Sequence, residues 1–231
     1  TIAGLCPAAF VTIGCPHLGV RRFTFLQLPP LLQGAARFVV GRTGEELMLR
    51  DTGSLLEQMT APGSRFIDSL RSFRRRGLYA NLWGDFMVPF GTAAIEPSWG
   101  AGISDEQNVA NFLARDQVSI IDEAVLNRLG NGVAARFDTQ TVSDNVGLQK
   151  DSTLEARMAR CLDACGWNKF AVGFQTASKL FPFAHNKIAA LRRDGWRRLA
   201  FSWLEGSEDG DALMVDIANY IASTPQKGTP E

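Results

Sequence analysis

The segment AAFVTIG, residues 8–14, is apolar on both of the faces that an extended strand presents. A strand of this kind must be covered on both sides, as the strands of parallel sheets are. Three further runs have a similar character, namely GLYANLW (77–83), KFAVGF (169–174) and WRRLAFSWL (196–204). Helical patterns separate these runs, so the sequence predicts an α/β fold with a mostly parallel sheet.

Helix signals are clearest in three places. Ser64 precedes a helical apolar pattern, so we expect it to cap a helix that ends at Gly77 with Arg74, Arg75 and Arg76 in its last turn. The stretch from Asn108 to Gly130 follows a possible capping box at Ser104 and Gln107 and predicts another helix. A last helix carries apolar residues from Leu213 to Ile221.

The four cysteines are too few for a disulfide scaffold. Cys161 and Cys165 could resemble half of a zinc site, but they share one helical stripe with Leu154, Met158 and Leu162. Core packing is therefore the preferred interpretation, and we expect neither a metal ion nor another cofactor.

Charge and hydropathy exclude several classes of partner. The chain has 24 basic and 24 acidic residues, so a net charge of zero gives no electrostatic reason to expect nucleic acid or an anionic membrane surface. No apolar run reaches about 18 residues, the length of a membrane-spanning helix. The sequence shows no signal-peptide pattern, which weakly favours an intracellular location, and it starts with Thr1 rather than Met.

Two polar residues follow predicted strands, where open α/β sheets place their working groups. Asp85 comes directly after GLYANLW and precedes the apolar segment FMVPFGTAAI. A carboxylate at this position can orient a base, although an Asx turn would also explain it. His185 lies in the apolar segment FPFAHN after KFAVGF, as a general base would, although a lone histidine is more often structural or surface-exposed.

The order Asp then His is the second half of the order Ser, Asp, His found in α/β-hydrolases. In such a triad the histidine accepts the proton of the nucleophile, and the aspartate holds the histidine tautomer and stabilises the imidazolium. We therefore expect Asp85 and His185 to converge at the carboxyl edge of one sheet.

Four segments in sequence order resemble motifs of the putative serine esterase family, the lipase-like α/β-hydrolases. The segment AAFVTIGCPHLGVRR resembles its F-[VI]-T-x-x-x-P-H-L-G motif, and GRTGEELMLRDTGSLLEQMT its R-T-G-x-x-L-x-L-x-D motif. The third resemblance is in FRRRGLYANLWGDFMVPFGTAAI, where the family has Y-A-N, then an Asp, then V-P-x-x-T. The fourth is in FPFAHNKIAAL, which resembles the family motif F-x-A-H-N-x-I. The resemblance implies that Asp85 is the triad acid and His185 the triad base. It also implies that His17, in the Pro-His-Leu-Gly motif, is a turn and packing residue beside the site.

The sequence departs from the family pattern in one respect, because it contains no G-x-S-x-G elbow for a nucleophilic serine. We therefore expect residues 1–223 to form the C-terminal part of a hydrolase domain, without its N-terminal strands and nucleophile elbow. The missing half of the domain would be a partner of this part. The long spacing between Asp85 and His185 predicts a helical insertion at about residues 98–150, and residues 224–231 form a polar tail.

The resemblance implies a serine esterase or lipase-like hydrolase that acts on lipid-type carboxylic esters. The unusually apolar segment 23–40 is consistent with core packing or with a lid over such a substrate. Peripheral contact with a membrane or a lipid droplet is a further expectation. The alternative, which the absent serine elbow favours, is a non-catalytic α/β-hydrolase-like domain that binds other molecules.

Overall fold

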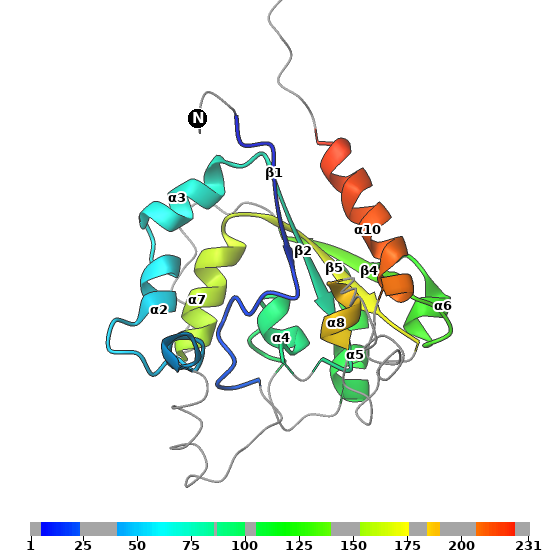
Figure 1. Ribbon diagram of the computed structural model, residues 1–231, viewed down its shortest axis with the longest axis horizontal. Helices are drawn as coiled ribbons and strands as arrows, with labels where there is room; N and C mark the ends of the chain where they lie inside the picture. Colours follow the sequence, from blue (N-terminus) through cyan, green and yellow to red (C-terminus); the bar gives the residue numbers. More distant parts are fainter. Residues whose placement is uncertain are drawn as a thin grey trace, which may run out of the picture.

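The computed structural model describes residues 6–23, 41–85, 87–99, 105–139, 153–175, 184–189 and 207–224. These residues form an α/β fold around a five-stranded sheet with the order β1-β2-β5-β4-β3 (Figure 1). The strands are β1 (Ala9–Ile13), β2 (Arg75–Asn81), β3 (Val118–Ile120), β4 (Gly132–Thr139) and β5 (Trp167–Gly173). Three of the four predicted apolar runs are therefore strands, and the fourth, at residues 196–204, lies outside the described residues.

The sheet is mixed, which corrects the expectation of a mostly parallel sheet. Strands β1, β2 and β5 run parallel, whereas β4 is antiparallel to β5 and β3 is antiparallel to β4. The sequence pattern misses β4 because Arg136 and Asp138 interrupt its apolar residues, and because the strand is irregular between Val133 and Ala135.

The segment between the Asp85 and His185 strands is also not the single helix expected for residues 108–130. It contains α5 (Asp105–Leu113), strand β3, α6 (Glu123–Leu126) and strand β4. The helix is interrupted because Asp122 Oδ1 accepts hydrogen bonds from the backbone N–H groups of Ala124 and Val125, which starts a new helix at α6. Ser104, the proposed cap, lies outside the described residues.

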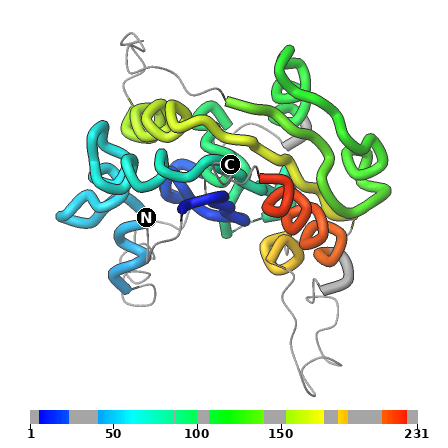
Figure 2. Tube along the Cα trace, turned by 90° about the horizontal axis from the view of Figure 1, so that it is seen from above, coloured from blue at the N-terminus to red at the C-terminus, as the bar shows by residue number. Residues whose placement is uncertain are grey.

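Helices cover both faces of the sheet. Trp167 faces α7 (Leu154–Asp163), because its indole N–H donates to the Leu162 carbonyl. Lys169, on the same face, points to the turn after α4 (Phe90–Ala93), where its Nζ donates to the Ile95 carbonyl. On the other face, the Phe170 ring packs between Tyr79 and Tyr220 of α10 (Ser207–Ala222). Figure 2 shows α10 beside α8 (Ala184–Ile188) and apart from α7.

The contact between α10 and β2 explains one glycine. A Cβ atom on Gly77 would lie 2.7 Å from a ring carbon of Tyr220, so a larger residue there would push α10 away from the sheet. The Tyr79 hydroxyl donates to Asp216 on the same helix, at 2.8 Å, and both contacts fix α10 against β2.

The two helices before β2 are α2 (Leu55–Thr60) and α3 (Arg65–Ser72). Ser64 caps α3 as predicted, since its hydroxyl accepts a hydrogen bond from the Ile67 N–H at 3.2 Å. The helix ends at Ser72, however, and Arg75 and Arg76 belong to β2 rather than to its last turn. Arg76 still compensates the helix end, because its guanidinium reaches back from the strand to the Leu70 and Phe73 carbonyls.

The cysteine stripe lies on α7 and the turn after it, with Met158, Leu162 and Cys165 buried and Cys161 partly exposed. The last predicted helix is present as α10. Most of the apolar segment 23–40 and of the tail 224–231 lies outside the described residues. In the part of the chain that the structure describes, no helix has the length and apolar character to cross a bilayer.

Candidate active site

Asp85 lies in the turn that follows β2, at the carboxyl edge of the parallel strands. Its side chain is only 1% exposed, and Gly84 before it has φ +70°, a left-handed conformation that glycine adopts without strain. One carboxylate oxygen, Oδ1, accepts from the backbone N–H groups of Met87 and Val88 at 3.0 and 2.8 Å. The expected Asx turn is therefore present, and it fixes the carboxylate in a single orientation.

The second oxygen of Asp85 faces His185. His185 Nδ1 lies 3.1 Å from Asp85 Oδ2, and the Ala184 N–H donates to the Gly84 carbonyl at 3.0 Å, so the two segments are also joined through their backbones. His185 is the second residue of α8 rather than part of a loop. Because an ionised carboxylate only accepts hydrogen bonds, Nδ1 carries the proton and Nε2 of the neutral ring is free to accept one.

The environment of His185 suits it to proton transfer. Its pKa is raised above the ordinary 6.5, mainly because the hydrogen bond to Asp85 favours the imidazolium form, and burial opposes this effect. The side chain is 24% exposed, so the ring borders solvent while the carboxylate beneath it is buried. This is the arrangement of a base whose conjugate acid is stabilised by a fixed negative charge.

The end of β1 provides the surface behind the histidine ring. Gly14, directly after β1, has φ +54°, and a Cβ atom there would lie 3.4 Å from Cε1 of His185 and 3.3 Å from Ile188. The Gly14 N–H donates to the Tyr79 carbonyl of β2. The ends of β1 and β2 therefore meet at His185, and the small residue at position 14 lets the ring approach.

Asn81 is a site residue to which the sequence pattern assigned no role. It is the last residue of β2, it is 1% exposed, and its Nδ2 donates to Asp85 Oδ2 at 2.8 Å. It shares that oxygen with His185. Two signals could have identified it, namely its position at a strand end four residues before the acid and its place as the Asn of the Y-A-N motif.

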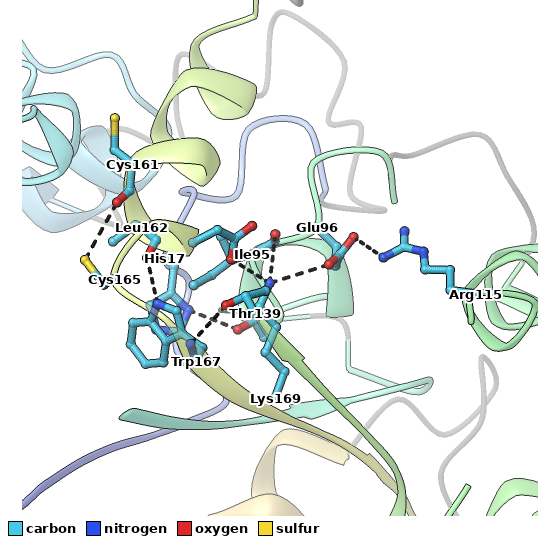
Figure 3. A network of polar contacts seen from close by, with 12 residues as sticks. His17, Ile95, Glu96, Arg115, Thr139, Cys161, Leu162, Cys165, Trp167 and Lys169 are labelled. Carbon is cyan, nitrogen blue, oxygen red and sulfur yellow. Dashed lines mark hydrogen bonds and ion pairs between the residues drawn. The ribbon is translucent and has the colours of Figure 1, made fainter. Parts of the chain in front are cut away.

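His17 has a packing role in the turn after β1, which is the role that the family resemblance implies. Its Nδ1 donates to the Ala93 carbonyl of α4 at 3.0 Å, and its ring meets the edge of Trp167 at 5.7 Å between centroids (Figure 3). Burial lowers its pKa to about 4. The neighbouring Leu18 N–H donates to Thr92 on α4, so this turn serves to attach β1 to α4.

A buried cluster of charges lies beside His17, and the sequence pattern did not indicate it. Lys169 of β5 has no exposed surface, and its Nζ lies 2.8 Å from Asp163 and 3.5 Å from Glu96. Glu96 in turn pairs with Arg115 at 2.8 Å (Figure 3). Burial raises the pKa of Asp163 to about 6, although the nearby Lys169 acts in the opposite direction. This cluster joins α7, β5 and the residues after α4 and α5.

Comparisons with known proteins agree with the family that the motifs resemble. Residues 1–97 match the family model described as putative serine esterase. A putative lipase of Schizosaccharomyces pombe is 33% identical over 99 residues, which are 40% of this chain and 12% of the yeast protein. No solved structure matches the chain. The resemblance is therefore confirmed for the first 97 residues, a range that includes Asp85 and excludes His185.

Proposed function

We propose that Asp85 and His185 are the acid and the base of a Ser-His-Asp triad in an enzyme that hydrolyses carboxylic esters of lipid-type substrates. The observation that carries the proposal is the contact of 3.1 Å between His185 Nδ1 and a buried carboxylate that accepts three further hydrogen bonds. A carboxylate fixed in this way holds one tautomer of the imidazole and stabilises its protonated form.

The chemistry follows from that geometry. His185 Nε2 takes the proton of a serine hydroxyl as the serine oxygen attacks the ester carbonyl carbon, and it then gives the proton to the departing alkoxide. A water molecule then attacks the acyl-serine and transfers its proton to the same nitrogen, which gives the proton to the departing serine oxygen as the acid is released. Asp85 stays ionised throughout and stabilises the imidazolium in each step.

The nucleophilic serine of the triad is not identified among the 231 residues, because they contain no G-x-S-x-G elbow. We propose that it comes from polypeptide outside these residues. In the described part of the chain, β1 is an edge strand that pairs only with β2, so its other edge is open to a further strand of such a domain.

The preference for lipid-type esters is supported by two observations. The relative from Schizosaccharomyces pombe is described as a putative lipase. In this chain the apolar side chain of Met87 is 51% exposed, two residues from the proposed acid, so the surface beside the site includes an apolar group. Contact with a membrane or a lipid droplet would follow from such a substrate. The missing elbow favours one alternative, a binding domain without catalytic activity.

The experiment compares the 231-residue chain with the natural polypeptide that contains it, using p-nitrophenyl butyrate turnover and labelling by a fluorophosphonate. We expect no turnover or label in the 231-residue chain and both in the natural polypeptide. There, His185→Ala or Asp85→Ala should lower kcat by about 10³- to 10⁴-fold. The control His17→Asn should leave turnover per folded molecule unchanged. If the 231-residue chain turns over the ester and His185→Ala abolishes this turnover, the chain must contain an unrecognised nucleophile. If the natural polypeptide is inactive, the result favours the binding domain.

A further inference from the structure

We propose that α6 and the turn that follows it, residues 123–131, position the proposed triad acid by holding Trp83 against the end of β5. The inference rests on the proposed role of Asp85 and His185. It assigns a function to the segment between their two strands, for which the sequence alone suggested none.

Trp83 is the residue through which the α6 segment acts on Asp85. It is 5% exposed and lies two residues before Asp85. Its indole N–H donates to the Phe174 carbonyl at 3.4 Å, directly after β5. A Cβ atom on Gly173 would lie 2.8 Å from Cζ2 and 3.1 Å from Cη2 of the indole, so the ring rests directly on the β5 backbone.

The α6 segment lies against the same indole and the same glycine. Val125 is buried, and its Cγ1 would lie 3.0 Å from a Cβ atom on Gly173, so Val125 and Trp83 share the surface of that glycine. The Arg128 guanidinium lies 4.9 Å from the centre of the Trp83 ring, within the range of a cation–π interaction. Trp83 is thus in contact with both β5 and Arg128, and Val125 packs on the same glycine beside it.

The turn after α6 is itself rigidly built. Arg128 has φ +63°, an unfavourable conformation for a residue with a side chain, and hydrogen bonds on either side maintain it. The Arg128 N–H donates to the Val125 carbonyl, and the Leu129 N–H donates to the Ala124 carbonyl. Asn131 accepts a hydrogen bond from the Gln175 N–H, which ties the end of the turn to the chain leaving β5.

These contacts decide where Asp85 lies relative to His185. The hydrogen bonds that orient the Asp85 carboxylate come from Asn81, Met87 and Val88, which belong to the same segment and move with it. Trp83 is the residue of this segment whose side chain rests on β5, the strand that leads to α8. A displacement of the indole therefore shifts Gly84 and Asp85 together and lengthens the Asp85–His185 contact.

The pKa of His185 measures this contact without any turnover, because the hydrogen bond to Asp85 is the main cause of its raised value. The chain has only two histidines, so NMR titration of the labelled imidazoles resolves both, and His17 serves as an internal reference. Gly173→Ala places a methyl group against Cζ2 and Cη2 of Trp83. We expect it to lower the pKa of His185 and to leave that of His17 unchanged.

Two further variants test whether Trp83 carries the effect. Trp83→Phe removes the indole atoms that the methyl group would meet, so Gly173→Ala should lower the pKa of His185 less in a Trp83→Phe background than in the wild-type chain. Arg128→Ala should lower that pKa by a smaller amount than Gly173→Ala, and Arg128→Lys should restore part of it. Arg128 is only half-buried, so these variants decide the question if Gly173→Ala does not fold.

The matched control is Arg115→Ala, which removes an arginine of the same segment that lies over Phe112 instead of Trp83. It should not change the pKa of His185. An unchanged pKa in folded Gly173→Ala and in Arg128→Ala, or an equal fall in Arg115→Ala, would overturn the inference. Because the titration needs no serine, a failure of the proposed ester hydrolysis appears only in the turnover assay and is separate from this result.

Discussion

Replacing His17 by asparagine should make the protein gain, rather than lose, resistance to mild acid. His17 is buried against Trp167 with Nδ1 donating to the Ala93 carbonyl, and its Nε2 is buried without a hydrogen-bond partner. Protonation would place a second N–H at that position, beside the cationic Lys169. The pKa of His17 is accordingly lowered to about 4 from its ordinary 6.5. Asparagine can keep the donor to Ala93 and cannot be protonated.

The size of the effect follows from this lowered pKa. Between pH 6.5 and about 4 the unfolded chain binds a proton at His17 that the folded chain does not, so folding stability falls as the pH falls through this range. Since one pKa unit corresponds to about 1.4 kcal/mol, His17 destabilises the fold by about 2 kcal/mol at about pH 5. The full effect approaches about 3 kcal/mol near pH 4.

Asp163 acts in the opposite direction in the same range. Its pKa is raised from 3.8 to about 6, so the folded chain binds a proton that the unfolded chain does not, and this stabilises the fold as the pH falls from about 6 to 3.8. Its side chain is 32% exposed, so solvent screening reduces the benefit to about 1 kcal/mol. The wild-type chain should therefore lose stability on acidification, and a chain with asparagine at position 17 should not.

Urea unfolding followed by tryptophan fluorescence, at several values between about pH 7 and pH 5, measures these slopes. His17→Asn should remove a loss of about 2 kcal/mol across the range, and Asp163→Asn should make the loss larger. The double variant isolates what the remaining groups contribute. A wild-type slope that His17→Asn leaves unchanged, or a measured pKa of His17 at or above 6.5, would refute the reasoning.

Two further predictions concern single contacts. Asp85→Asn removes the negative charge and the carboxylate acceptor that raise the pKa of His185, so NMR titration should find that pKa lowered. The control Asp138→Asn, at an exposed ion pair with Arg136, should not change the pKa of His185. An unchanged value in Asp85→Asn would contradict the observed contact. Ser64→Ala removes the cap of α3 and should lower the free energy of unfolding by about 1 kcal/mol. The control is Ser69, whose hydroxyl donates to the Arg65 carbonyl of its own helix, and Ser69→Ala should have a smaller effect. Equal losses in urea unfolding would show that the cap is not the cause.

The sequence predicts the meeting of Asp85 and His185 because parallel strands end at the same edge of a sheet, and both residues follow continuous apolar runs. It does not predict β4, because Arg136 and Asp138, which pair with each other, interrupt the buried apolar residues of this strand. Asn81 and Lys169 were missed for another reason. Each lies within a run that predicts a strand, and its role depends on partners that only the tertiary structure brings near. The partner of Asn81 is Asp85. The partners of Lys169 are Glu96 and Asp163.

The order of the strands also determines how the proposed acid and base respond to local unfolding. In the described sheet β2 lies between β1 and β5, and β5 lies between β2 and β4, so the strands that lead to Asp85 and His185 are both internal. Transient opening starts where backbone hydrogen bonds are fewest, here at β1 and at the three-residue β3. Fraying at either border leaves β2 and β5 in register, so the Asp85–His185 contact should persist through motions that open the margins of the sheet.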